Sequence, residues 1–438
     1  MHEAARESRS SALELADDAL LDRLQHAAFD YFRDNANPVN GLVADTTRPG
    51  APSSIAVVGF ALSAYPVGVE RHWMERADAL ARTLAALRFF SASDQSGSEQ
   101  ATGYRGFYYH FLDMQSGTRV WLSEVSLIDT ALLIAGVLAA ATYFDAQTAD
   151  EIELRRLAGA LYARVDWRWA QRERGAVTHG WKPECGFLNY GWEGYSESIL
   201  LYVLGLGSTT HPLTAESYPA WTMTYQWENL YGHDYLYAGP LFIHQYSHAW
   251  IDFRGIRDAF MREKDCDYFE NSRRATYVQR EYAARNPHGF AGYGADRWGL
   301  SAGDGPSTPP QMIHGRHQAF YGYAARGVPY GPDDGTLSGP AMLSSLVFAP
   351  ELVMPALRNL HGHGGSDGDR LIQASGFNAT VGEAGLNGWV SEGTFGLDEG
   401  MIVLMIENFR SGMPWRLGCG SNWIRSGLHR AGFRGGWL

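Results

Sequence analysis

The segment SLIDTALLIAGVLAAATY, residues 126–143, indicates most directly how this chain folds. It is apolar on every side of a helix, apart from Asp129 near its start. A helix that is apolar all round must be covered all round by other elements. The segment therefore predicts an interior helix of a large domain, with Ser126 as its N-cap and Asp129 in the first turn.

The segments on either side alternate between this apolar type and an amphipathic type. Residues 53–65 and 196–206 are apolar nearly all round, whereas residues 74–90 and 150–167 each have one polar face. Further helical segments of mixed pattern lie at 18–33, 215–225, 247–260 and 268–284. Such alternation predicts an inner ring of helices wrapped by an outer ring, an all-α fold of the (α/α)6-barrel type with about a dozen helices. An irregular helical bundle and an α-solenoid are the alternatives, and the absence of a repeated sequence weighs against the solenoid.

The expected domain organisation is simple. Residues 1–14 are polar and are predicted to form a flexible tail, and residues 15–438 a single domain. Short strands are expected at 105–111 and 236–243. The loops rich in glycine are expected to line the mouth of the barrel; they lie at 103–106, 175–194, 289–305, 327–339 and 362–368.

Composition narrows the functional class. The 438 residues are 45% hydrophobic and 19% charged, which is typical of a globular protein, and the net charge of −12 argues against binding to nucleic acid or an anionic membrane. The aromatic content is high, with 14 Trp and 23 Tyr, whose flat faces and polar edges suit sugar rings. Many of these side chains would equally fill a large core.

Cofactor and location signals are sparse. The three cysteines, Cys185, Cys266 and Cys419, fit no zinc pattern, so neither a metal nor another cofactor is expected. The chain has no apolar run of about 20 residues and no visible signal peptide. As written, the sequence predicts a cytoplasmic protein, or a periplasmic or secreted one if a leader was removed.

Glycoside hydrolysis usually needs two carboxyl groups, so acids beside aromatic residues at the starts of apolar helices are the natural candidates. Glu197 follows the aromatic loop that contains Tyr190, Trp192 and Tyr195, and it opens an apolar helix. Burial at such a helix edge would raise its pKa and suit a general acid. The local sequence favours equally a glutamate that merely caps the helix.

Two further acidic segments have the same character. Glu124 and Asp129 flank the start of the apolar segment 126–143, and Asp398 and Glu399 precede the apolar run that begins at Met401. An Asp in such a position is costly unless it binds something polar, either a substrate or a partner group of the protein.

Other polar residues are weaker candidates for substrate contacts. His244, Gln245 and His248 lie in one segment, and the two histidines are four residues apart, but the glutamate of a His-Glu-x-x-His metal site is absent. Asp304 lies with Trp298 in a Gly-rich loop, where it would bind a hydroxyl or close a turn. Trp389 is a further candidate for stacking on sugar.

Five motifs occur together in a characteristic order: GFYYHFLD at 106–113, SLIDTALL at 126–133, Glu197 with LGSTTHP at 206–212, GPLFIHQYSH at 239–248 and YFENS at 268–272. This set resembles the glucoamylase-like domain of bacterial β-1,2-glucanases, glycoside hydrolase family 144 and its relatives, over roughly residues 20–412. The resemblance implies an (α/α)6 barrel, no metal, and hydrolysis of β-1,2-linked glucan with inversion.

The resemblance also assigns roles. It implies Glu197 as the acid and Asp398 as the base, with Asp129 as a further catalytic candidate and Glu124 in the cleft. Glu399 departs from the family pattern, in which Gln follows the aspartate, and could perturb the pKa of Asp398.

The leading hypothesis is thus an endo-acting β-1,2-glucanase that releases sophoro-oligosaccharides. An exo-acting hydrolase of short β-1,2-glucooligosaccharides, a transglycosylase and an inactive glycan-binding protein are the alternatives. The expected partner is the β-glucan substrate, and the oligomeric state is open.

Overall fold

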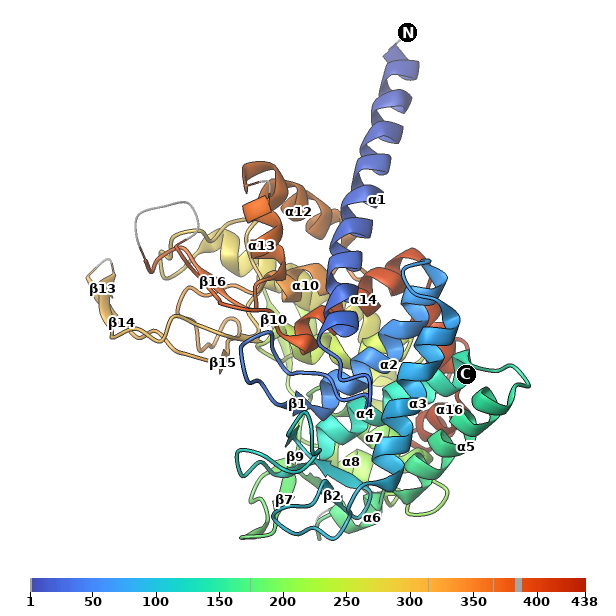
Figure 1. Ribbon diagram of the computed structural model, residues 1–438. Coiled ribbons are helices and arrows are strands. Elements are labelled where there is room, and N and C mark those ends of the chain that lie inside the picture. Colours follow the sequence, from blue (N-terminus) through green and yellow to red (C-terminus); the bar gives the residue numbers. More distant parts are fainter. Residues whose placement is uncertain (1, 174, 314, 365, 383–387) are drawn as a thin grey trace.

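The structure is a computed structural model that describes residues 2–173, 175–313, 315–364, 366–382 and 388–438 (Figure 1). It is mostly helical, as the sequence predicts. The α-helices are α1 (His2–Asp34), α2 (Ile55–Glu70), α3 (Arg76–Ala92), α4 (Leu127–Tyr143), α5 (Ala149–Arg164), α6 (Trp167–Ala170), α7 (Ile199–Gly207), α8 (Ser217–Thr222), α9 (Ala259–Glu263), α10 (Tyr268–Arg285), α11 (Gly339–Ser344), α12 (Pro350–Gly364), α13 (Ser366–Gln373), α14 (Gly396–Arg410), α15 (Met413–Gly420) and α16 (Asn422–Arg430). Two 3-10 helices, η1 (Leu241–His244) and η2 (Tyr246–Ala249), follow one another.

The apolar segments form the centre of the molecule. Helices α2, α4 and α7 are buried along most or all of their length, as are α11 and much of α14. Helix α2 packs between α4 and α14, α4 also contacts α7, and α14 contacts α11 and η2. Helices α2 and α4 meet backbone to backbone, because a Cβ atom on Gly136 would come within 2.0 Å of the carbonyl oxygen of Gly59.

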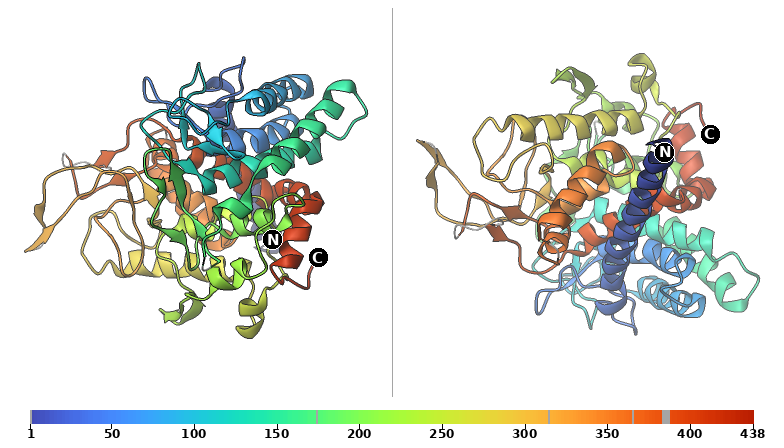
Figure 2. Two further views of the ribbon diagram at one scale, coloured as in Figure 1. Left: turned by 90° about the horizontal axis from the view of Figure 1, so that it is seen from below. Right: turned by 90° about the horizontal axis from the view of Figure 1, so that it is seen from above.

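Amphipathic helices cover this centre. Helix α1 packs on α14, α3 packs on α5, and α16 packs on α7. The alternation of buried and amphipathic helices that the sequence predicts is therefore present. Residues 2–14, expected as a tail, form the first turns of α1, which projects beyond the body of the molecule (Figures 1 and 2).

The strands are short and lie in the loops. They are β1 (Ser53–Ser54), β2 (Gly103–Tyr104), β3 (Phe107–Tyr109), β4 (Phe111–Leu112), β5 (Val125–Ser126), β6 (Val177–Thr178), β7 (Gly180–Lys182), β8 (Gly186–Phe187), β9 (Gly191–Trp192), β10 (Trp227–Leu230), β11 (His233–Leu236), β12 (Ala302–Gly303), β13 (Gln311–Ile313), β14 (Arg316–Gln318), β15 (Ala324–Ala325), β16 (Phe377–Asn378) and β17 (Trp389–Val390). The largest sheet that the described residues form is antiparallel, in the order β2-β3-β5-β7-β8, and the β13–β14 hairpin forms a projecting arm (Figure 1).

One predicted helix is wrong. Residues 247–260 were expected to be helical, but η2 ends at Ala249 and the chain then runs without a helix to α9. The carboxylate of Asp252 accepts hydrogen bonds from the backbone and side chain of Arg254, and Gly255 follows with φ of +74°. These local hydrogen bonds and the positive φ prevent a continuous helix over residues 247–260, although the apolar pattern extends through them.

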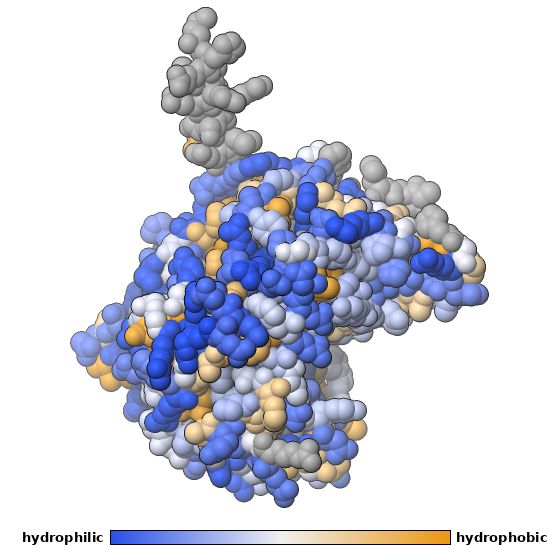
Figure 3. Space-filling view, turned by 180° about the vertical axis from the view of Figure 1, so that it is seen from behind, coloured by the Kyte–Doolittle hydropathy of each residue, from blue (hydrophilic) through white to orange (hydrophobic). Residues whose placement is uncertain are grey.

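The surface is predominantly polar. On the face that Figure 3 shows, hydrophobic residues are scattered among hydrophilic ones. Among the described residues, no helix is both long enough and apolar enough to span a membrane.

Candidate active site

Acidic side chains converge from the starts of three buried helices. Asp129 lies in the first turn of α4, Glu197 two residues before α7, and Asp398 in the first turn of α14. Asp45, from the loop after α1, joins them, because the backbone N–H of Gly396 donates to its carbonyl oxygen at 2.9 Å. The four carboxyl groups thus form one cluster, in which the charge of Asp129 raises the pKa of both Glu197 and Asp45.

Two tyrosines mark the common space that the acids face. The charges of Asp398, Glu197 and Asp129 all raise the pKa of the Tyr323 hydroxyl and of the Tyr246 hydroxyl, beyond the effect of burial. Tyr323 nevertheless keeps 65% of its surface accessible. Solvent therefore reaches the side of the acid cluster that Tyr323 faces, and we treat this accessible region as the candidate cleft.

Glu197 has the properties of a general acid. Burial raises its pKa to about 7, with a smaller contribution from the charge of Asp129. Its side chain stays partly accessible, while its backbone carbonyl is held by the Ser247 hydroxyl at 2.9 Å. A carboxyl group with this pKa is still protonated near neutral pH, where an ordinary glutamate is ionised.

Asp398 has the properties expected of the second carboxyl group that glycoside hydrolysis needs. Burial raises its pKa to about 7, and the charge of Asp45 adds to this effect, whereas a hydrogen bond with Ser375 opposes it. Its Oδ2 atom is buried and has no hydrogen-bond partner among the described residues. The neighbouring Glu399 is almost wholly buried, and burial raises its pKa well above the usual value.

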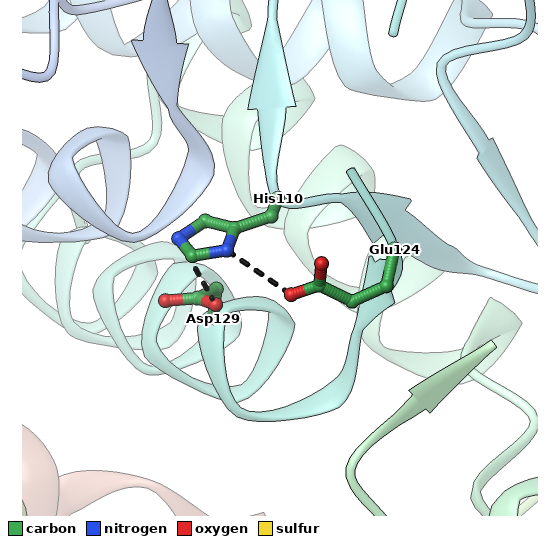
Figure 4. Close-up of side chains that lie close together, drawn as sticks. All are labelled: His110, Glu124 and Asp129. Carbon is green, nitrogen blue, oxygen red and sulfur yellow. Dashed lines mark hydrogen bonds and ion pairs between the residues drawn. The ribbon is translucent and has the colours of Figure 1, made fainter. Parts of the chain in front are cut away.

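A histidine links Asp129 to one more carboxylate, that of Glu124 (Figure 4). His110 Nδ1 lies 3.1 Å from Glu124 Oε1, and His110 Nε2 lies 3.5 Å from Asp129 Oδ2. Burial alone would lower the pKa of His110, but the charges of Asp129 and Glu124 outweigh it and raise this pKa to about 9. The imidazole is therefore positively charged at neutral pH, and its charge and hydrogen bond hold the pKa of Glu124 below its usual value despite burial.

The same three side chains are the one cluster of possible metal ligands found among the described residues, with ligand atoms within 4.8 Å of one another. The imidazolium already supplies a positive charge between the two carboxylates. Protonated His110 cannot also donate a lone pair, so a metal ion would have to displace its protons. The arrangement fits a hydrogen-bonded triad that fixes Asp129 and Glu124 in the cleft.

The aromatic residues predicted beside Glu197 take different positions. Tyr190 is exposed, and Trp192 stacks on His179 with 4.1 Å between ring centroids, near Glu124. Tyr195 is partly accessible and packs among the rings of Tyr225, His244 and Tyr268. Trp389 is partly accessible in β17. Stacking of Tyr190 and Trp192 on sugar therefore remains a prediction that their exposure permits.

Four predicted substrate contacts lie beneath the site instead of inside it. The side chains of His244, Gln245, His248 and Trp298 are only 1–2% exposed. His244 bonds the carbonyl oxygen of Ala238, Gln245 donates to Ala341 O and Ser345 Oγ, and His248 bonds Ser272. These hydrogen bonds are made within the core, whereas Trp298 Nε1 and His248 Nδ1 have no hydrogen-bond partner among the described residues. At 1–2% exposure none of the four side chains is placed to touch a substrate in this structure.

Asp304 is also engaged by the protein. Its Oδ2 atom pairs with the Arg48 guanidinium and accepts a hydrogen bond from Ser391 Oγ at 3.0 Å. Arg48 further donates to the carbonyl oxygen of Glu392 at 3.0 Å. The predicted hydroxyl-binding residue thus joins three loops, and any sugar contact would compete with this ion pair.

Sequence reasoning missed several residues of the cleft: Asp45, His110, Tyr246 and Tyr323 were not assigned a role. His110 and Tyr246 stand inside quoted motifs, so their position in the motif was an available signal. Asp45 and Tyr323 lie in irregular loops where no spacing or helix start marks them.

The chain is similar to known proteins in sequence and in overall structure. The Glycoamylase family, described as "Putative glucoamylase", matches residues 189–419, more than half of the chain. One similar solved structure is a putative glucoamylase from Bacteroides uniformis, which is 29% identical, with 96% of this chain and 98% of that chain covered and a TM-score of 0.84. Another is the endo-β-1,2-glucanase from Chitinophaga pinensis in complex with sophorotriose and glucose. It is 26% identical, with 96% of this chain and 99% of that chain covered and a TM-score of 0.82.

A curated relative is the exo β-1,2-glucooligosaccharide sophorohydrolase (non-reducing end) of Parabacteroides distasonis, 26% identical over 452 residues. The match covers 95% of this chain but only 58% of that protein. The match to the family covers Glu197, Asp398 and the buried segments between them. This chain belongs to the Glycoamylase family of putative glucoamylases.

Proposed function

We propose that this chain is a glycoside hydrolase that cleaves β-1,2-linked glucan with inversion of configuration. The observation that carries the proposal is the pair Glu197 and Asp398, two partly accessible carboxyl groups whose pKa values desolvation raises to about 7. Glycoside hydrolysis with inversion needs one carboxylic acid and one carboxylate on either side of the bond that breaks.

The roles follow from the surroundings of each acid. Glu197 donates its proton to the glycosidic oxygen, so the leaving sugar departs as a neutral alcohol. Asp398, with Oδ2 unoccupied by protein, accepts a proton from the attacking water, directly or through an intervening hydroxyl group. Asp129, held by Ser126 and His110, lies near Glu197, and its charge adds to the effect of burial in favouring the protonated form of Glu197.

The linkage is supported by the relatives. Both the solved endo-β-1,2-glucanase and the curated sophorohydrolase act on β-1,2-linked glucose, and each aligns with almost the whole of this chain. The buried segments α2, α4, α7, η1–η2, α11 and α14 fit the six inner helices of an (α/α)6 barrel, and the candidate acids stand at the starts of three of them, α4, α7 and α14.

The mode of cleavage has two candidates. Endo action is the first, supported by the solved neighbour from Chitinophaga pinensis. Exo action is the second, favoured by the ion pair of Arg48 with Asp304, which joins two loops. Arg48 is near the acid cluster, because its charge acts on Asp45: it lowers the pKa of that carboxyl group, against the larger effect of burial. A bridge that closes one end of the cleft would leave room only for a chain end.

The test is incubation with linear β-1,2-glucan and, in parallel, with β-1,3-, β-1,4- and α-1,4-glucans. Glu197→Gln is the catalytic variant, and Glu193→Gln, an exposed glutamate in the same loop, is the matched control. Products from the β-1,2-glucan alone, lost in Glu197→Gln and kept in the control, support the proposal. A ladder of oligosaccharides indicates endo action, and a single small product indicates exo action. Turnover of another glucan instead would overturn the linkage.

A further inference from the structure

The loop between β4 and β5 ends in a tight turn, residues 120–123, that exposes two large apolar side chains. The Ser123 N–H donates to the Val120 carbonyl oxygen at 3.1 Å, and the two central residues, Trp121 and Leu122, have φ of +58° and +50°. Positive φ at both central positions is the conformation of a type I′ turn, which is normally built from Gly, Asn and Asp.

Tryptophan and leucine are unfavourable in this turn for two independent reasons. Each bulky residue at positive φ carries backbone strain of about 1–3 kcal/mol. Moreover, Trp121 and Leu122 are 68% and 67% exposed, so burial in the core does not compensate for that strain. A strained turn that displays a large flat ring to solvent indicates a binding role, because neither packing nor local propensity explains it.

The turn continues directly into the catalytic cleft. The Trp121 ring lies 5.0 Å from the Phe111 ring, and the Phe111 ring stacks on the His110 imidazole at 3.9 Å and 13°. On the paired segment, the Glu124 carbonyl oxygen accepts the His110 N–H at 2.9 Å. Two ring contacts thus separate Trp121 from the His110–Glu124–Asp129 triad of Figure 4.

The turn is also held rigidly. Arg119, whose side chain is buried, donates from Nε to the Ser123 carbonyl oxygen at 2.5 Å and forms a two-point ion pair with Glu184. Its guanidinium lies over the Tyr109 ring at 4.7 Å. A turn fixed on both sides presents the indole in one orientation, which lowers the entropy lost when a ligand stacks on it.

We infer that Trp121 is a stacking platform for a glucose unit of the β-glucan chain, at a subsite beyond the triad. The inference rests on the proposed function and adds a chain-length preference to it. The indole face would cover the flat C–H face of a pyranose, and Leu122 would extend the apolar contact. A substrate long enough to reach this turn gains affinity, and a shorter one does not.

The experiment compares KM for long linear β-1,2-glucan with KM for the shortest oligosaccharide that is cleaved. In Trp121→Ala this ratio should rise about tenfold, which corresponds to about 1.4 kcal/mol, and Trp121→Phe should recover most of the loss. Phe409→Ala, which removes an exposed ring at the opposite end of α14 from Asp398, is the matched control and should leave the ratio unchanged.

Trp121→Gly separates binding from folding. Glycine tolerates positive φ, so this variant should melt at a higher temperature than the wild type while its KM ratio rises as in Trp121→Ala. A KM ratio that stays constant in all three Trp121 variants would overturn the platform. Loss of self-association in these variants, measured by sedimentation with unchanged KM, would also overturn it and identify the turn as a protein contact.

Failure of the proposed function can be distinguished from failure of the stacking platform. If the wild type does not cleave β-1,2-glucan, tryptophan fluorescence titrations of wild type and Trp121→Ala with soluble β-glucans of other linkages test the platform alone. Weaker binding by the variant supports the platform on a different glucan, and equal affinity refutes it.

Discussion

Replacing Glu197 by glutamine should remove activity and, at the same time, stabilise the fold in a pH-dependent manner. Burial raises the pKa of this carboxyl group from 4.5 to about 7. Between these values the folded state keeps the proton while the unfolded state releases it, so the wild type loses stability as pH rises through this window. Glutamine does not titrate and escapes that loss.

The magnitude follows from the shift. Each pH unit is worth about 1.4 kcal/mol, so the unfolding free energy of Glu197→Gln relative to wild type should increase by roughly 3 kcal/mol between pH 4.5 and pH 7.5. Loss of a general acid should lower kcat by about 10²- to 10⁴-fold. An acid whose replacement stabilises the fold but abolishes turnover is what we expect of a desolvated catalytic residue.

The assay is urea denaturation of both proteins at pH 4.5, 6 and 7.5, with kcat measured on the same samples. Glu193 is exposed in the same loop, so Glu193→Gln serves as the control. Its difference in unfolding free energy from the wild type should not increase with pH. A stability difference that stays constant with pH, or that narrows as pH rises, would refute the reasoning that burial sets the state of Glu197.

Three further results are expected. The profile of kcat/KM against pH should be a narrow bell centred near pH 7, because Glu197 must be protonated and Asp398 ionised. A broad plateau from pH 5 to 9 would contradict the assignment. Glu399→Gln should keep kcat within about fivefold at pH 6.5, because burial favours the neutral form of that carboxyl group and glutamine is neutral too; kinetics at one substrate concentration above KM would show this. Arg48→Ala should lengthen the products resolved by chromatography if its bridge to Asp304 closes the cleft, whereas an unchanged product pattern would assign the bridge to stability alone.

The parts of the fold that follow from periodicity were predictable. The expected helix at 126–143 is α4, Ser126 caps it by accepting the Asp129 N–H at 3.3 Å, and the expected helix at 268–284 is α10. These features depend on residues within one or two turns of each other, where side-chain pattern and capping chemistry determine the outcome.

The cleft was only partly predictable because it joins distant segments. Acids at helix starts could be found from the pattern, as Glu197, Asp129 and Asp398 were. Asp45 reaches the cluster through a loop held by its backbone bond to Gly396, and no local pattern encodes that bond.

Trp298 shows the reverse error. It was expected to contact substrate from a Gly-rich loop. In the structure Gly299 has φ of +120°, and a Cβ atom there would lie 2.8 Å from the carbonyl oxygen of Ser338. The glycine allows the loop to pack tightly against the start of α11, which buries the neighbouring indole.

The most direct test of the account is proton NMR of the first reducing ends released from linear β-1,2-glucan by the wild type, with Glu197→Gln in parallel. The account predicts that the wild type first releases sugar in the α configuration, which then equilibrates, and that the variant releases none on that timescale. First release in the β configuration would contradict an inverting pair, and undiminished release by Glu197→Gln would contradict the role of Glu197 as the acid.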